Sequence, residues 1–145
     1  MITVREMMTT EAQTLSSSDS LADVQAIMAK YDCHHVPIVT KNDELVGLVT
    51  HRDVLRVTES SLLENENRIV PQDIPISDFM IKDVFTIVPE TSLRKAAVYI
   101  RTQRYGCLPV VRAKELVGII TDSDFVNIAI DLLEQLEDSE PLEES

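Results

Sequence analysis

The sequence predicts an α/β fold (α+β in some schemes) made of two β-α-β-β-α repeats that pack about a pseudo-twofold axis. Three observations lead to this prediction. The chain has 145 residues, of which 44% are hydrophobic, so it can build one compact core. A pattern in its first half recurs in its second half. Each copy of the pattern alternates β-branched runs with apolar residues at helical spacing.

The repeat consists of two blocks whose copies keep a nearly constant spacing. The copies are CHHVPIV (33–39) with YGCLPVV (105–111), and LVGLVTHRDV (45–54) with LVGIITDSDF (116–125). The offset is 72 in the first block and 71 in the second, so the turn between the blocks differs by one residue. Gly47 then aligns with Gly118, and Met8 with Met80. We interpret Met7, Met8 and Met80 as lining the core or a cleft.

The elements of each copy follow in the same order. A short strand, 14–16 or 85–88, precedes a cap-like residue, Asp19 or Thr91, and a helix. Apolar positions at helical spacing indicate that helix, and they are Leu21, Val24, Ile27 and Met28, then Leu93, Ala96, Ala97 and Ile100. Two strands joined by a polar turn come next, 36–39 with 45–50 and 108–111 with 116–121. A last helix begins near Asp53 or Asp124.

These elements divide the chain into four parts. We expect a first repeat over 1–58, a linker with a helical extension at its start over 59–75, a second repeat over 76–133 and an acidic tail over 134–145. The tail holds six acidic residues and no basic one, so we expect it to be frayed and solvated. A unit of about 60 residues is only marginally stable alone. The two repeats should therefore pack together, with related clefts between them where a ligand would bind.

Composition excludes several classes of function. The net charge of −12 argues against binding a nucleic-acid backbone. No apolar run approaches the about 20 residues that span a bilayer, and the first residues do not resemble a signal peptide, so we expect a cytoplasmic protein without a membrane partner. Three glycines are too few for a Walker-type loop or a GxGxxG turn. Two cysteines cannot build a disulfide framework.

The pattern G-h-h-T-x-x-D places a hydroxyl at the end of a strand and a carboxylate at the start of a helix. Its copies are Thr50 with Asp53 and Thr121 with Asp124. One interpretation is a helix N-cap, because Asp accepts hydrogen bonds from the first free N–H groups of a helix. The other is a ribose site, in which the carboxylate accepts two vicinal hydroxyls and phosphate lies near the helix start. The spacing alone leaves both open.

The ordered blocks resemble a pair of cystathionine β-synthase (CBS) domains over roughly residues 2–132. The blocks are h-x-x-h-M, V-P-x-T-S-L-x-x-A, h-P-V-V and G-I-I-T-x-x-D, and the first repeat departs from them with Ser17 in place of Pro89. The resemblance implies β-α-β-β-α repeats paired as a Bateman module. It also implies adenosyl ligands such as AMP, ADP, ATP or S-adenosylmethionine between the repeats, and dimerisation into a disc.

The resemblance also implies roles for individual residues. The ribose would be held by Asp53 and Asp124, assisted by Thr50 and Thr121. Adenine would contact Tyr105, Gly106 and Cys107 in the Asp53 site, and Cys33, His34 and His35 in the Asp124 site. Phosphate would meet His34, His35, His51 and Arg52 in the first site, and Gly106, Cys107, Asp122 and Ser123 in the second.

These assignments make the two sites electrostatically unequal. The cationic candidates gather at the Asp53 site, whereas Asp122 adds negative charge to the other. We therefore expect the Asp53 site to take a phosphorylated nucleotide. The Asp124 site would take an uncharged adenosine-like group or stay empty. The alternative is that His34, His51 and Arg52 are solvated surface residues.

Catalysis and metal binding are not supported by the pattern. His34 and His35 are neighbours on a strand and point to opposite faces, which does not match a zinc site. Cys33 lacks an orienting third group for nucleophilic chemistry. We expect a non-enzymatic regulatory module that needs no cofactor, forms a homodimer and senses adenine nucleotides on behalf of an unknown effector protein. The alternative is a CBS-fold interaction or dimerisation protein that binds no ligand.

Overall fold

The computed structural model describes residues 1–63 and 70–140, with side chains omitted for 61–63. Its helices and strands alternate in the order expected for two repeats. They are α1 (Val4–Met7), α2 (Leu21–Tyr31), β1 (His35–Val39), β2 (Leu45–Thr50), α3 (His51–Leu63), the 3₁₀ turns η1 (Pro71–Asp73) and η2 (Ile76–Asp78), α4 (Leu93–Thr102), β3 (Cys107–Arg112), β4 (Glu115–Thr121) and α5 (Asp122–Ser139). The α/β class predicted from the sequence is confirmed.

Each repeat is centred on an antiparallel hairpin, β1 with β2 and β3 with β4. The register is equivalent in the two hairpins, because Pro37 pairs with Leu48 just as Pro109 pairs with Ile119. Both hairpins carry a bulge directly after the residue that pairs with the glycine of the repeat. These pairs are Ile38 with Gly47 and Val110 with Gly118. The short strands expected at 14–16 and 85–88 are reduced to single parallel bridges, Leu15 to Ile38 and Ile87 to Val110.

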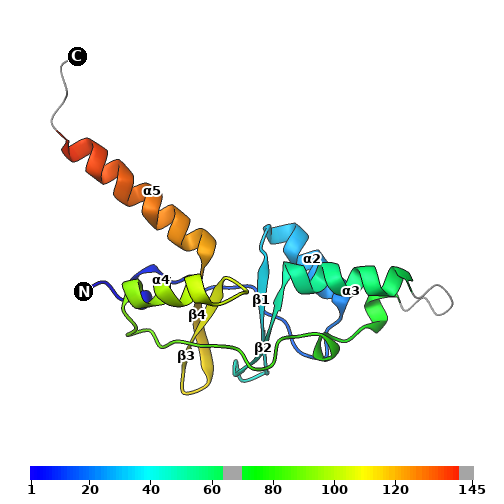
Figure 1. The fold of residues 1–145 in the computed structure, drawn as a ribbon. Helices are drawn as coiled ribbons and strands as arrows, with labels where there is room; N and C mark the ends of the chain where they lie inside the picture. Colours follow the sequence, from blue (N-terminus) through cyan, green and yellow to red (C-terminus); the bar gives the residue numbers. More distant parts are fainter. Residues whose placement is uncertain (64–69, 141–145) are drawn as a thin grey trace, which may run out of the picture.

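The two hairpins lie next to each other at the centre of the molecule. Figure 1 shows α2 and α3 on one side of them and α4 and α5 on the other. Their loops pair directly, since Leu45 N–H donates to the Lys114 carbonyl at 3.0 Å and Leu116 N–H to the Asp43 carbonyl at 2.9 Å. Leu48, Cys107 and Ile119 form a buried cluster of their own. The repeats therefore share one packed body.

The helix caps differ from the predicted ones by one residue. Ser20 caps α2 and Ser92 caps α4, each accepting a hydrogen bond from a backbone N–H three residues on. The predicted caps serve the preceding turns instead. The Asp19 carboxylate accepts from Ser16 N–H at 2.7 Å, and the Thr91 hydroxyl accepts from Val88 N–H at 3.3 Å. Adjacent cap-forming residues made the choice ambiguous from the sequence.

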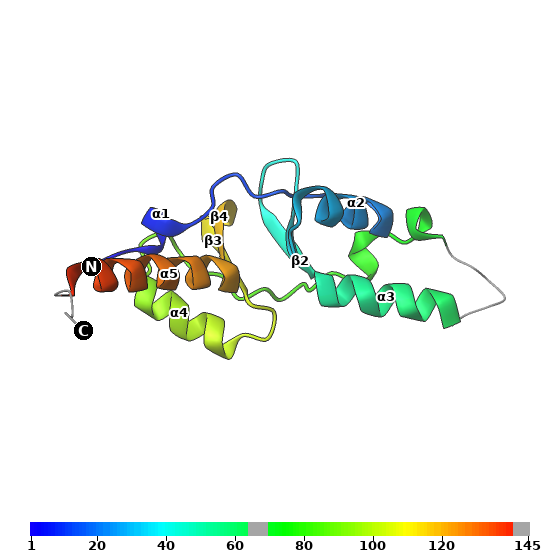
Figure 2. The same ribbon diagram turned by 90° about the horizontal axis from the view of Figure 1, so that it is seen from above.

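The opening segment of each repeat packs on the core of the other repeat. Val4 is fully buried against Leu108 and Ile120, while Ile76 is fully buried against Val24. The backbone hydrogen bonds are equivalent. Val4 N–H donates to the Thr91 carbonyl and Ile76 N–H donates to the Asp19 carbonyl, both at 2.8 Å. Figure 2 shows α1 on the side of α4 and α5. This exchange ties the two repeats together.

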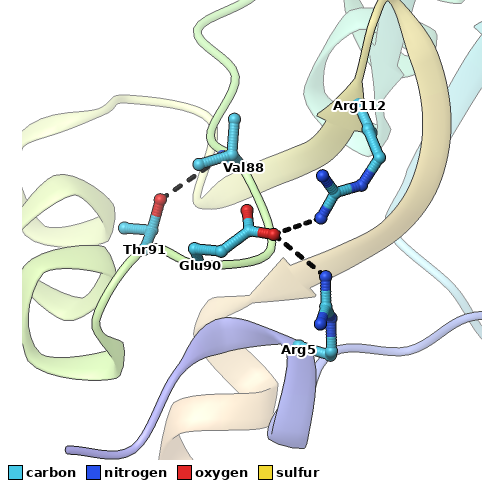
Figure 3. Close-up of polar contacts among 5 residues, drawn as sticks. All are labelled: Arg5, Val88, Glu90, Thr91 and Arg112. Carbon is cyan, nitrogen blue, oxygen red and sulfur yellow. Dashed lines mark hydrogen bonds and ion pairs between the residues drawn. The ribbon is translucent and has the colours of Figure 1, made fainter.

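An exposed ion cluster adds to the attachment of α1. Glu90 Oε1 lies 3.0 Å from an Arg5 guanidinium nitrogen and also contacts Arg112 at the end of β3 (Figure 3). The two arginines lower the pKa of the Glu90 carboxyl, the bond from Arg112 being the larger cause. Because all three side chains are exposed, these ion pairs contribute little to the free energy of unfolding. Their main effect is to orient α1.

The segments predicted as linker and tail are partly ordered. Residues 59–63 continue α3, which agrees with the expected helical extension, and Ile74 packs against the first core cluster. Residues 134–139 belong to α5, so the expectation of a frayed tail was wrong for them. Residues 64–69 and 141–145 of these two segments lie outside the described residues. Within the described part of the chain, no helix is both long and apolar enough to cross a membrane.

Candidate functional site

A cavity of about 970 Å³ lies where the start of α3 faces the start of α5 and the loop after α4. This volume is in the range of small-molecule sites, about 300–1,000 Å³. Its walls come from both repeats. The lining residues are His34, His35, Thr50, His51, Arg52, Asp53, Arg56, Ile81, Ile100, Gln103, Arg104, Tyr105, Gly106, Asp122, Ser123, Val126 and Asn127. Most of the residues predicted for the Asp53 site are thus brought together.

Asp53 is buried at the edge of this cavity, at position N3 of α3. Its Oδ2 accepts from Thr50 N–H at 3.0 Å and from the Thr50 hydroxyl at 2.9 Å, while Thr50 Oγ1 accepts from Asp53 N–H at 3.2 Å. This reciprocal pair is a capping box. Thr50 is therefore the cap and Asp53 its partner, whereas the capping interpretation of the sequence had assigned the cap to the aspartate.

The second copy of the motif repeats this geometry. Asp124 Oδ2 accepts from Thr121 N–H at 2.9 Å, and Thr121 Oγ1 accepts from Asp124 N–H at 3.3 Å. Thr121 and Asp124 are half-buried, and it is the two residues between them, Asp122 and Ser123, that line the cavity. The sequence-predicted second site thus contributes its helix start to the same cavity.

Cationic groups gather on the Asp53 side. The rings of His34 and His51 lie 5.3 Å apart, and His51 N–H donates to the His34 carbonyl at 2.8 Å. Arg52 follows on α3, and both His51 and Arg52 are exposed. Across the cavity, Asp122 is exposed beside Gly106, whose carbonyl accepts from Asp122 N–H at 3.0 Å. His34, His51 and Arg52 therefore lie on the Asp53 side and Asp122 on the other, while the expected difference in ligand between the two ends stays a prediction.

His35 connects the two repeats across the cavity. Its Nε2 lies 2.5 Å from the carbonyl oxygen of Tyr105, so Nε2 carries the proton that this carbonyl accepts. Burial lowers the pKa of His35, and the nearby His34 acts in the same direction, whereas Tyr105, Asp122 and Asp124 oppose the shift. A neutral, hydrogen-bonded His35 is better suited to positioning the Tyr105 loop than to binding phosphate.

The loop that precedes β3 forms the wall opposite Asp53. Tyr105 is half-buried, and its hydroxyl accepts from Phe85 N–H at 2.8 Å, which fixes the ring. Gly106 has a φ of +64°, and a side chain there would lie 2.8 Å from Asp122. Only glycine adopts this left-handed conformation without strain. The loop therefore brings a flat aromatic surface and a bare backbone to the cavity.

The two cysteines predicted to contact adenine lie in packed regions. Cys107 is fully buried between the hairpins, and burial raises the pKa of its thiol to about 12. Cys33 packs against the first core cluster, where its pKa is also raised, mainly by burial. Neither thiol is activated as a nucleophile.

Sequence reasoning missed several lining residues. Arg56, Gln103 and Arg104 bring polar groups, and Ile81, Ile100, Val126 and Asn127 bring further surface. Arg56 and Asn127 occupy the same place in the two repeats, three residues after the motif aspartate. Because residues one helical turn apart share a face of the helix, this spacing could have identified them as lining residues. Ile81 and Ile100 reach the cavity through tertiary packing that no local pattern indicates.

The chain belongs to the CBS domain family. The family model for the CBS domain matches twice, over residues 4–60 and 76–131. A CBS domain-containing protein of Dictyostelium discoideum, DDB_G0289609, is 28% identical over 137 residues, which is 92% of this chain and 94% of that one. The tandem CBS arrangement predicted from the sequence is confirmed.

Solved structures share the fold over nearly the whole chain. A protein of Vibrio cholerae named AcuB, after acetoin utilization, is 44% identical with a TM-score of 0.85, covering 94% of this chain and 98% of that one. CBSX2, solved in complex with AMP, is 24% identical with a TM-score of 0.78, covering 92% and 99%. The CBS domain pair of MJ0100, solved with 5-methylthioadenosine and S-adenosyl-L-methionine, is 23% identical with a TM-score of 0.75, covering 90% and 97%.

Other relatives are longer proteins. Protein MJ1225 of Methanocaldococcus jannaschii is 30% identical over 125 residues, or 86% of this chain, and the homoserine O-acetyltransferase of Methanococcus vannielii is 29% identical over a similar span. The chain covers 42% of the first protein and 24% of the second.

Proposed function

We propose that the protein is a non-enzymatic regulatory module that binds an adenine nucleotide in the cavity between its repeats and acts on a separate effector protein. The observation that carries the proposal is the buried Asp53 at a helix start, in one cavity with Tyr105, Arg52 and His51. AMP, ADP and ATP are the favoured ligands, with S-adenosylmethionine as a further candidate. AMP and S-adenosyl-L-methionine occur in the complexes of CBSX2 and MJ0100, which supports an adenosine-containing ligand.

Each part of a nucleotide has a matching surface. The ribose hydroxyls would donate to Asp53, with Thr50 beside it, and adenine would lie against Tyr105 and Gly106. The phosphate would lie near the start of α3, where the helix dipole and the side chains of His51 and Arg52 favour an anion. His34 adds to this set, while His35 acts through its bond to Tyr105.

The Asp124 end would bind differently. Asp122 repels phosphate there, so we propose that this end takes an uncharged adenosine-like group or stays empty. Cys33 and Cys107 act as packing residues in this proposal. The module would work in the cytoplasm and without a required cofactor. The two repeats could pack in two conformations. A ligand with different affinity for these conformations would shift their populations and so change the surface that the effector protein binds.

Thermal unfolding with a ligand panel tests the proposal. The panel is AMP, ADP, ATP, S-adenosylmethionine and NADH, applied to the wild type and to the matched variants Asp53→Asn and Asp124→Asn. A ligand at about 100 times its Kd stabilises by about 2.7 kcal/mol, which is a visible shift in Tm. We expect a shift with a phosphorylated nucleotide that Asp53→Asn removes and Asp124→Asn keeps. Asparagine can still accept the backbone bond of the capping box, so the helix starts are preserved.

A ligand-free interaction protein is the second candidate, and α5 is the observation that favours it. Five large apolar side chains on this helix are exposed: Val126, Ile130, Leu132, Leu133 and Leu136. Several exposed apolar side chains on one helix are typical of a binding surface for another protein or a second copy. No Tm shift with any compound of the panel, together with self-association, would favour this function. Homodimerisation is compatible with both candidates.

A further inference from the structure

The carboxylate of Asp53 has partners on both of its oxygens. Oδ2 accepts two bonds from Thr50, and Oδ1 lies 2.9 Å from a guanidinium nitrogen of Arg56. Only 7% of the Asp53 side chain is exposed. The acceptor that a ribose hydroxyl would need is therefore covered by Arg56 in this structure.

Arg56 is in contact with solvent. Its side chain is 63% exposed, it lines the same cavity as His51 and Arg52, and it makes one bond to the buried carboxylate of Asp53. A guanidinium on a long aliphatic stem can turn from one acceptor to another. A phosphate group is the acceptor that best matches a guanidinium.

The second repeat has no such cover. The residue equivalent to Arg56 is Asn127, which also lines the cavity. Among the ion pairs of residues 1–63 and 70–140, none involves Asp124. The covered carboxylate is thus a property of the first repeat alone.

We propose that Arg56 determines which adenosyl compounds the cavity accepts, by exchanging Asp53 for the phosphate of the ligand. When ribose hydroxyls donate to Oδ1, the guanidinium is displaced, and a nucleotide supplies a phosphate that it can bind. Adenosine and 5-methylthioadenosine supply no such acceptor, and the sulfonium of S-adenosylmethionine repels the arginine. The cavity therefore favours phosphorylated ligands over neutral or cationic ones. This inference rests on the proposed function.

Calorimetric titration of the wild type, Arg56→Gln and Arg56→Lys with AMP and with adenosine tests it. A charge-assisted bond contributes about tenfold to a hundredfold in affinity. We expect Arg56→Gln to weaken AMP binding by about this factor while adenosine binding stays equal or tightens, because Asp53 is uncovered. Arg56→Lys keeps the charge and should give an intermediate ratio. Arg101→Gln, an exposed arginine on α4, is the matched control and should leave both affinities unchanged.

Two results would overturn the inference. If Arg56→Gln weakens AMP and adenosine by the same factor, or changes neither, Arg56 does not discriminate between them. If the wild type binds neither compound, nor ADP or ATP, the proposed function fails and this inference fails with it. The first result leaves nucleotide binding intact, so the two failures are distinguishable.

Discussion

Asp53, which is buried, and His35, which is half-buried, are polar side chains that shape the cavity. His35 binds the carbonyl of Tyr105 in the other repeat, at 2.5 Å, and Asp53 joins Thr50 to Arg56. Both are fixed by burial and by these bonds, whereas the charged groups suited to a ligand, His51 and Arg52, are exposed beside them. His35 thus positions the Tyr105 loop, whereas we propose Asp53, His51 and Arg52 as the groups that meet the ligand.

The partial burial of His35 predicts a pH dependence of stability. The pKa of His35 is lowered from 6.5, mainly by burial, so the unfolded chain takes up a proton at a higher pH than the folded chain. Its contribution is complete above the unfolded pKa and is lost as the pH falls below it. We expect the free energy of unfolding, measured with urea, to fall as the pH is lowered from about 7 through about 6.5, the ordinary pKa of histidine.

His35→Gln provides the control for this prediction. The glutamine amide can still donate to the Tyr105 carbonyl, but it does not titrate. The fall in stability over that pH range should be smaller in this variant than in the wild type. An identical slope in both proteins would show that another group is responsible.

The sequence predicted the residues of the cavity better than their roles. His34, His51, Arg52 and Asp53 do line one cavity with Tyr105, because the motif fixes a helix start beside a strand end. The family resemblance assigned Cys107 to adenine with the segment before β3, but strand alternation turns its side chain into the core. Arg56 was missed because it lies one helical turn beyond the motif, although its i,i+3 spacing from Asp53 is one at which helical residues form ion pairs.

At the scale of elements, the glycines of β2 and β4 receive the methionines of the exchanged segments. A Cβ at Gly47 would lie 2.6 Å from the sulfur of Met80, and a Cβ at Gly118 would lie 2.6 Å from the sulfur of Met8. Backbone carbonyls stand close behind, at 3.1 and 3.0 Å. The repeat therefore keeps a glycine in each hairpin so that a methionine can pack on it.

Gly47→Ala should destabilise the protein by about 1–3 kcal/mol, because the added methyl overpacks this contact. Chemical denaturation measures the change. In a Met80→Ala background the same substitution should be less costly, since the sulfur is absent. Strictly additive effects would contradict the contact. Gly118→Ala with Met8→Ala offers the same test in the other repeat.

The exchanged opening segments predict that a residue near the N-terminus stabilises the second repeat. Val4 is fully buried in that core, and full burial of such a side chain contributes about 1.5–3 kcal/mol. Val4→Ala should cost a substantial part of this in urea denaturation. Val88→Ala, at a valine that is 48% exposed, should change stability by less than about 0.5 kcal/mol. Equal effects of the two substitutions would contradict the exchange.

The hairpins were predictable and the exchange was not. The β-branched runs 36–39 and 108–111 are bounded by polar turns, so their local pattern identifies them. The exchange depends on which hydrophobic core a short segment packs against. The sequence around Val4 or Ile76 does not indicate whether that core belongs to the same repeat or to the other one. The domain boundaries at 58, 75 and 133 remain a proposal. At the start of each repeat the packing crosses these boundaries, because Val4 and Ile76 belong to the core of the other repeat.

At the scale of the whole molecule, α5 extends away from the body, as Figure 1 shows. Phe125 and Ile128 near its start pack against the second core cluster, whereas Leu132 is 53% and Leu136 is 60% exposed. The helix extends beyond the hairpin from which it starts, so its exposed apolar side chains could be buried only by another part of the protein or by another molecule. A second copy of the chain is the simplest source of cover.

Self-association through α5 can be measured by sedimentation equilibrium. We expect the wild type to exceed the monomer mass of 16.3 kDa, and Leu133→Asp or Leu136→Asp to return it towards that mass. Val70→Asp, at an exposed residue away from α5, is the control and should not change the mass. A wild type that is monomeric at all concentrations would contradict this prediction.

The proposed function requires that the cavity hold an adenine nucleotide with its ribose on Asp53. A crystal structure of the protein grown with AMP would show where the nucleotide binds. We expect AMP with its ribose hydroxyls on Asp53, its adenine beside Tyr105 and its phosphate near the start of α3. Arg56 should then contact the phosphate in place of Asp53. AMP bound with its ribose on Asp124, or outside this cavity, would show that the proposed site is wrong.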